Sequence, residues 1–324
     1  MQTPADYAAR YEELTVPSLE GSADLATGIA VDRYLLKIRD GGYDERTRLG
    51  QKIQKDLAIR RKADKSAKIR VRVDTPGGVE EREFDKLELS DSDQLWLLLR
   101  YPYTGKGSPE GVQAILQLAS VELPGSPAMV KPANFQAYCD KWLGLDCNGL
   151  VGNYLRHVWK GIHWSDVTAT ASPVSPNNDI KAIWNGFDGT VRSSAAEVSF
   201  KDLNLLVMLD PKTGEIRPGG PGHPPGHIMI SQPHEIEYDT GLKSMLGVPD
   251  DKEVPGLIVL ESTGAKDSAD KKDGVAKSAY AFVDQLPPKT KANPNPKPNG
   301  VFKVRRGLNN TGLFVRIKGA AWSG

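Results

Sequence analysis

The sequence predicts an α+β fold in which helices precede a group of strands. Apolar side chains recur at helical spacing in the first half of the chain, for example at residues 109–120 and 148–160. In the second half, apolar runs at 202–210, 227–231 and 256–260 predict buried strands. A chain of 324 residues, of which 39% are apolar and 26% charged, can bury a sizeable core. We expect one large or two modest domains.

Residues 1–87 are predicted to form an accessory region. Residues 29–36 suit either a strand or the start of a helix. Residues 44–68 have a helical pattern with many basic side chains, which indicates either contact with an anionic polymer or a solvated helix face. We favour the solvated face, because acidic residues bring the net charge to +1 and nucleic acid is then not an expected partner. Residues 69–74 and 79–89, separated by turn residues, predict a hairpin.

Residues 88–324 are predicted to form the catalytic domain. Three helical stretches lead toward Cys147, the last of them at residues 133–142. Beyond the strands named above, residues 301–306 and 312–317 predict a hairpin that ends the catalytic sheet. The Pro-, Lys- and Asn-rich residues 287–299 predict an exposed loop.

Several classes of protein are not expected from this composition. No apolar run approaches the roughly 18 residues of a membrane span. The first residues lack a basic stretch followed by an apolar one, so we expect either a cytoplasmic protein or export by a signal-independent route. The two cysteines, Cys139 and Cys147, do not make a disulfide scaffold, and no Cys/His spacing suggests zinc. We therefore expect no metal and no cofactor.

Cys147 is the candidate nucleophile. Either Asp146 or Asn148 suits the N-cap of the following helix, which places Cys147 at or beside its first turn. The free N–H groups and the positive end of the helix dipole favour a thiolate there and can bind an oxyanion. The stretch Asp146-Cys147-Asn148-Gly149-Leu150-Val151 resembles the Asp-Cys-Ser-Gly-(Leu/Phe)-Val signature of the NlpC/P60 superfamily of papain-like cysteine peptidases and amidases. Asn148 departs from it, since the family usually has serine there.

The resemblance extends to a downstream histidine and an acid. In this superfamily a glycine–histidine pair begins the strand that carries the general base, and Gly226-His227 matches it. The competing histidines, His157, His163, His223 and His234, lack that strand context. The third catalytic residue follows a later strand, where Glu261 ends the run Gly256–Leu260. The gap between His227 and Glu261 exceeds the usual one and implies an insertion at residues 235–254.

The resemblance implies a papain-like fold with the nucleophile helix packed on an antiparallel β-sheet. It further implies a cysteine peptidase or amidase that uses Cys147, His227 and Glu261, and whose substrate is a peptide or a peptidoglycan fragment. Asp146 and Asn148 are expected at the substrate, Asp146 by contacting a substrate amine. Two alternatives stay open: a catalytically silent binding module with the same fold, and a thiol-dependent acyl or peptidyl transferase.

Overall fold

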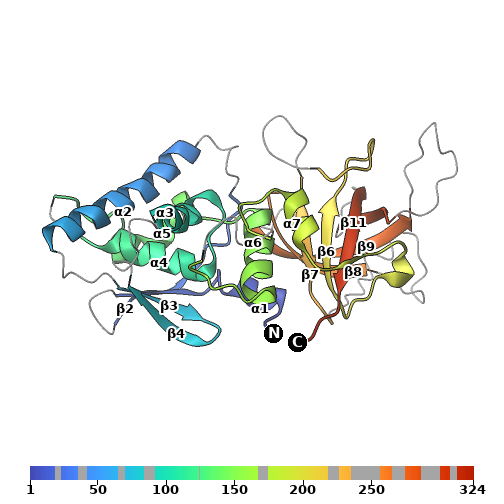
Figure 1. Cartoon of the computed structure of the whole chain (residues 1–324), viewed down its shortest axis with the longest axis horizontal. Helices are drawn as coiled ribbons and strands as arrows, with labels where there is room; N and C mark the ends of the chain where they lie inside the picture. The colour runs from blue at the N-terminus through green and yellow to red at the C-terminus, as the bar shows by residue number, and fades with distance from the viewer. Residues whose placement is uncertain are drawn as a thin grey trace.

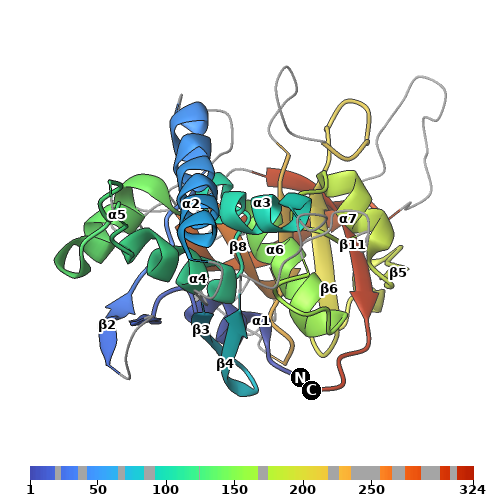
Figure 2. The same ribbon diagram turned by 60° about the vertical axis from the view of Figure 1, so that its left-hand side comes forward.

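The structure is a computed structural model of the chain. It describes residues 1–18, 23–35, 42–64, 70–83, 92–123, 125–166, 174–217, 226–234, 256–264, 274–285, 300–306 and 312–324. Helices and short hairpins occupy one part of the molecule and a β-barrel the other, with α1 and α6 between them (Figure 1). The two chain ends lie close together in both views (Figure 1 and Figure 2).

The helices have well-defined starts. The described α-helices are α1 (Pro4–Ala9), α2 (Tyr43–Ala63), α3 (Ser92–Arg100), α4 (Pro109–Ser120), α5 (Phe135–Trp142), α6 (Cys147–Asn153) and α7 (Ile180–Gly186). Helix α4 has the bounds that the sequence predicts, because Ser108 caps it by accepting a hydrogen bond from the Gly111 N–H and Pro109 occupies its first position. The helix predicted at 148–160 begins one residue earlier, and a π-helical turn (Tyr154–Trp159) continues it beyond α6.

Two antiparallel hairpins belong to the N-terminal region. One pairs β1 (Leu14–Pro17) with β2 (Asp24–Ile29), and the other pairs β3 (Arg70–Thr75) with β4 (Gly78–Glu83). The second hairpin was predicted, although residues 84–89 of its expected returning arm lie outside the described residues. Beyond β2, Tyr34 forms a bridge with Leu145, so the N-terminal chain lies directly beside the segment that leads into Cys147.

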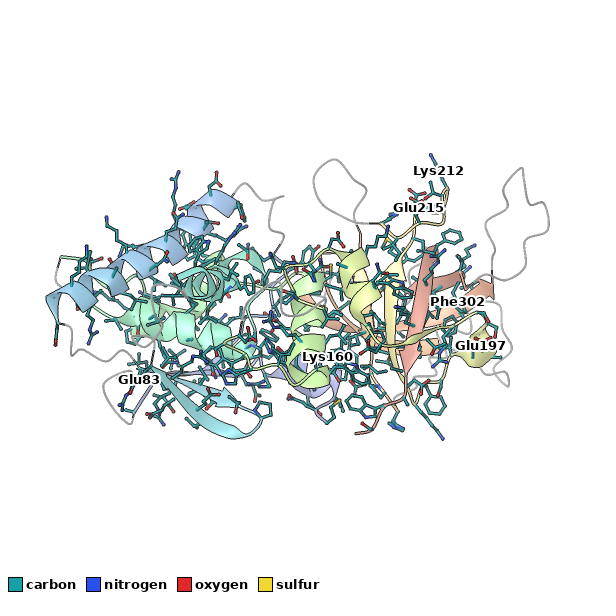
Figure 3. The ribbon with its side chains drawn as sticks, viewed as in Figure 1. Glu83, Lys160, Glu197, Lys212, Glu215 and Phe302 are labelled. Atoms are coloured by element: carbon teal, nitrogen blue, oxygen red, sulfur yellow. The ribbon has the colours of Figure 1, made fainter. Side chains whose placement is uncertain are left out.

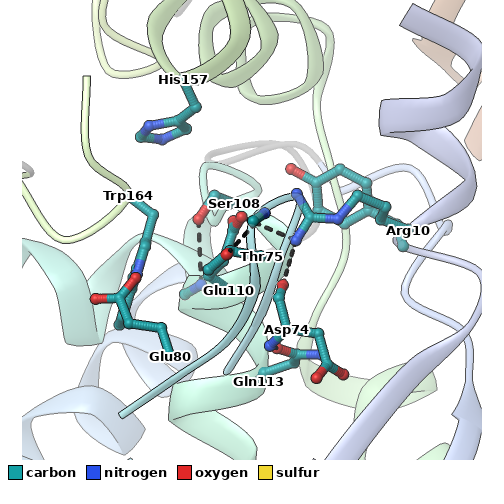
Figure 4. A network of polar contacts seen from close by, with 12 residues as sticks. Arg10, Asp74, Thr75, Glu80, Ser108, Glu110, Gln113, His157 and Trp164 are labelled. Carbon is teal, nitrogen blue, oxygen red and sulfur yellow. Dashed lines mark hydrogen bonds and ion pairs between the residues drawn. The ribbon is translucent and has the colours of Figure 1, made fainter. Parts of the chain in front are cut away.

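Side chains of α4 bind the β3–β4 hairpin. Gln113 accepts a hydrogen bond from the Asp74 N–H at 2.8 Å and donates one to the Asp74 carboxylate. Arg10 donates to the Asp74 carbonyl and pairs with the buried Glu110 carboxylate at 2.8 Å (Figure 4). One cluster of buried apolar side chains runs from Tyr7 through α4 and α6 to the barrel. Residues on both sides of the expected boundary at residue 87 therefore share a core, and the boundary itself stays a prediction.

Six strands in the second half form a closed antiparallel barrel. They are β6 (Leu203–Met208), β7 (Ile228–Ser231), β8 (Gly256–Thr263), β9 (Gly274–Gln285), β10 (Phe302–Arg306) and β11 (Gly312–Ala320). Neighbouring strands pair in the order β10-β9-β8-β7-β6-β11, and β10 also pairs with β11, which closes the ring. The short β5 (Thr190–Val191) adds to β11 outside the ring.

The closed barrel corrects the predicted fold class. The resemblance of the sequence to NlpC/P60 enzymes predicts a papain-like fold with the nucleophile helix on an antiparallel sheet, and this prediction is wrong. The predicted final hairpin, β10–β11, is present, but β11 also pairs with β6 and leaves the six strands without free edges between them. Pairing between strands more than 100 residues apart leaves no local signal in the sequence. Helix α6 contacts the outside of this barrel at β7 and β8.

Alternation along each strand separates the barrel interior from its outer wall. The interior cluster takes side chains from all six strands: Leu206, Met229, Leu257, Val259, Tyr280, Phe302, Val304, Val315 and Ile317. The residues between them, such as Ile230 and Leu260, belong instead to the large cluster shared with the helices. Figure 3 shows Phe302 on the barrel and the charged Lys212 and Glu215 on the loop beyond β6, at the edge of the molecule. No described helix combines the length and the apolarity that a membrane span requires.

Candidate active site

Cys147 is the first residue of α6, and Asp146 caps that helix. The Asp146 carboxylate accepts a hydrogen bond from the Gly149 N–H at 2.6 Å. It also pairs with the Lys106 ammonium at 2.5 Å, and both side chains are almost fully buried. Asp146 thus fixes the start of α6, and its contacts with Lys106 and Gly149 differ from the expected contact with a substrate amine.

Position 149 requires a glycine because there is no room for a side chain. A Cβ atom at this position would lie 1.8 Å from the Gly105 carbonyl oxygen, far inside any contact distance. The same carbonyl accepts the Asp146 N–H at 3.1 Å, so the loop around Gly105 holds the start of α6 from outside. The sequence Asp-Cys-Asn-Gly therefore combines a cap, a first-turn thiol and a residue small enough for this close approach.

The Cys147 thiol is buried, with the residue only 7% exposed. It lies 3.5 Å from the Asn148 side-chain oxygen, and the Asn148 amide donates to the Asn178 carbonyl at 2.8 Å. The backbone N–H of Cys147 belongs to the first helical turn, where N–H groups have no acceptor within the helix. A substrate carbonyl oxygen placed beside the thiol could accept a hydrogen bond from this N–H group.

His227 directly precedes β7, and its imidazole interacts with the Cys147 side chain. Its Nε2 lies 2.6 Å from Oε2 of Glu261, which leaves Nδ1 for the sulfur. Burial alone would lower the pKa of His227, but the hydrogen bonds and negative charges of Cys147 and Glu261 outweigh it and raise the pKa to about 10. The arrangement therefore favours the imidazolium form of His227.

The register of β7 and β8 brings the histidine and the acid together. Ile230 pairs with Leu260, and continuing this antiparallel register places Glu261 diagonally across from His227 on the same, interior face. Ser262, the next residue of β8 after Glu261, lies on the opposite face, which is the outer face of the barrel. Its hydroxyl donates a hydrogen bond to the Leu145 carbonyl at 2.8 Å. Strand β8 thus contacts the histidine through Glu261 on its inner face and the chain before Cys147 through Ser262 on its outer face.

Glu261 is fully buried at the interior face of the barrel, where two further side chains bind it. Arg306 Nε donates to Oε1 at 2.7 Å, and the Tyr280 hydroxyl donates to Oε2 at 3.1 Å. Burial raises the pKa of Glu261, but His227 and Arg306 more than compensate, and the pKa is lowered overall. The carboxylate is therefore ionised while completely removed from water.

The other predicted candidates lie elsewhere. Burial raises the pKa of the Cys139 thiol on α5 to about 12, which suits a packed, unreactive cysteine. His157 donates to the Ile162 carbonyl at 2.7 Å, and burial lowers its pKa to about 4. His163 pairs with Glu80 at 2.9 Å, His234 lies in the turn beyond β7, and His223 lies outside the described residues.

Three residues of the site were not singled out from the sequence: Lys106, Tyr280 and Arg306. For Arg306 a signal exists, because Phe302, Val304 and Arg306 alternate on one face of β10 and an arginine in phase with apolar residues needs a buried partner. Nothing local marks Lys106, which is about 40 residues from Asp146. Across the described ranges, no group of three or more His, Cys, Asp and Glu side chains is placed to hold a metal ion.

Comparisons with protein-family models, with curated proteins and with solved structures found no match for this chain. The interpretation of the site therefore rests on its own geometry.

Proposed function

We propose that the chain is a cysteine hydrolase that cleaves an amide bond through Cys147, His227 and Glu261. The observation that carries the proposal is the continuous row of contacts from the thiol at the start of α6, through the imidazole, to a buried ionised carboxylate. A thiol, a base and a group that orients the base are the parts that nucleophilic acyl transfer requires.

The reaction follows from these contacts. The Cys147 thiolate attacks the substrate carbonyl carbon, a C–S bond forms, and the backbone N–H of Cys147 stabilises the oxyanion. As the C–N bond breaks, His227 gives the proton on Nδ1 to the leaving amine, which leaves a thioester. Water then loses a proton to His227 and attacks the thioester. The C–S bond breaks, the acid product leaves, and the thiolate–imidazolium pair is restored.

We propose peptidoglycan stem peptides as the substrate class. The support for this step is the resemblance of Asp146-Cys147-Asn148-Gly149 and Gly226-His227 to the NlpC/P60 signatures. The closed barrel lends no support from the fold, and the contact between Asp146 and Lys106 lends none from amine recognition.

The test is incubation of the purified chain with peptidoglycan fragments, with products followed by mass spectrometry. We expect new amine and carboxyl termini with wild-type protein, none with Cys147→Ala, and continued activity with the control Cys139→Ala. A transient acyl adduct on Cys147 should appear at short times. Products that join two fragments instead of adding water would indicate a transferase. Binding of fragments with no adduct and no product would contradict the proposal and favour a binding module.

A further inference from the structure

Arg306 ends β10 with its side chain directed to the same face as Phe302 and Val304, which belong to the barrel interior. The residue is only 8% exposed, and its Nε bonds one oxygen of Glu261, while His227 and Tyr280 bond the other. Arg306 and Tyr280 are also partners across β10 and β9. The carboxylate is thus held from two sides, and the two charged contacts go to different oxygens.

A buried carboxylate needs a counter-charge at every step of a reaction. His227 can supply one only while it is protonated, and in the proposed mechanism it gives up that proton when the amine leaves. Arginine keeps its charge throughout the accessible pH range, so Arg306 is a cation that stays in place while the charge of His227 changes. An ionised Glu261 fixes the proton on Nε2 of His227 and leaves Nδ1 for Cys147.

We propose that Arg306, assisted by Tyr280, is a positioning residue of the active site: it keeps Glu261 ionised and oriented whether His227 is charged or neutral, and so helps to set the acidic limit of the pH range in which Cys147 reacts. The proposal rests on the proposed function, since it assigns Arg306 a part in the same thiol chemistry. A purely structural ion pair would affect stability and leave the pH dependence of the thiol unchanged.

The experiment measures the rate of Cys147 alkylation by iodoacetamide between pH 4 and 9, in the full-length chain carrying Cys139→Ala. Arg306→Gln removes the charge and retains a donor, whereas Arg306→Lys retains the charge. Because an opposite charge within hydrogen-bond distance lowers a carboxyl pKa by about 1 to 3 units, we expect Arg306→Gln to raise the acidic limit by at least about one pH unit. Arg306→Lys should stay close to the wild-type curve.

The matched control is Arg305→Gln, on the neighbouring position of β10 and therefore on its opposite face. Arg305→Gln should leave the pH profile of alkylation unchanged. Superposition of the Arg306→Gln and wild-type profiles would overturn the proposal. If Arg306→Gln does not fold, Tyr280→Phe takes its place, and a smaller upward shift is then expected. An unshifted Tyr280→Phe profile would likewise overturn it.

His227→Ala separates the two levels of the inference. If this variant loses the reactivity of Cys147 at low pH while Arg306→Gln leaves the acidic limit unmoved, the assignment of Arg306 alone is wrong. If His227→Ala leaves the alkylation profile unchanged, the thiol–imidazole pair is absent from the chemistry, and both the proposed function and the assignment of Arg306 fail.

Discussion

Glu261→Gln is the substitution that perturbs the candidate site with the least change in shape. Glu261 accepts hydrogen bonds from three donors, Arg306 Nε, His227 Nε2 and the Tyr280 hydroxyl. A glutamine offers one oxygen and one NH₂ group, so it cannot accept hydrogen bonds from both Arg306 and His227. Because Arg306 can only donate, the glutamine oxygen must face it, and the NH₂ group then faces His227.

The consequence for His227 is a change of tautomer. To accept from the new NH₂ group, Nε2 must lose its proton, and Nδ1 then carries a proton toward Cys147. The imidazole can no longer take a proton from the thiol, and the imidazolium loses its neighbouring negative charge. We expect a cost of about 3 to 5 kcal/mol in the activation barrier, or a fall in kcat of roughly two hundred- to five thousand-fold, with little change in substrate binding.

The assay is peptidoglycan-fragment hydrolysis by wild type, Glu261→Gln, His227→Ala and the double variant, with Glu215→Gln as an exposed control. Since the two residues act as a unit, the double variant should cost much less than the sum of the single ones. Turnover by Glu261→Gln within a few-fold of wild type, or strict additivity in the cycle, would refute the reasoning and move the orienting role to another residue.

Three further predictions concern stability. Gly149→Ala places a Cβ atom 1.8 Å from a backbone carbonyl oxygen and should cost more than about 3 kcal/mol in urea unfolding, whereas Gly111→Ala in α4 meets only ordinary contacts and should be neutral or slightly stabilising. Lys106→Met leaves the Asp146 carboxylate without this buried ammonium and should lower the free energy of unfolding by about 3 to 5 kcal/mol. Much of that loss should be recovered in the double variant with Asp146→Asn. No recovery would rule out charge burial as the cause. The pKa of His157 is lowered to about 4 in the folded state, against about 6.5 in the unfolded state. The unfolded chain therefore binds the proton first, and stability falls as the pH drops from about 6.5 to 4. His157→Gln should reduce this loss by up to about 2 kcal/mol in thermal melts recorded across that pH range.

The sequence predicted the parts of the site better than the architecture around them. A cap, a thiol and a glycine lie within four residues of each other, and a glycine–histidine pair begins an apolar strand, so local patterns were enough to choose Cys147 and His227. Glu261 was found because an acid ended a strand of otherwise apolar residues. The contact between His227 and Glu261 is present at 2.6 Å. Their catalytic roles stay predictions.

The fold class was wrong because barrel closure depends on pairing between distant strands. The strand pattern of residues 302–306 and 312–320 is the same whether β11 ends an open sheet or joins β6. Lys106 was missed for the same reason, since a buried ion pair across about 40 residues has no local signature. The alternation that places Arg306 beside Phe302 and Val304 was visible in the sequence, and its meaning became clear only with the acid it binds.

Closure of the barrel is required for the complete set of contacts around Glu261. The residues appear in the chain in the order Cys147, His227, Glu261 and Arg306, and Arg306 lies on the hairpin that joins the last strand to the first. A chain that has formed β6 to β9 but not β10 would have to bury Glu261 without its fixed cation, which is energetically unfavourable. Closure of the ring thus completes the ion pairs of Glu261. Under the proposed function, an incompletely folded or shortened chain would carry Cys147 without the contacts that make it reactive.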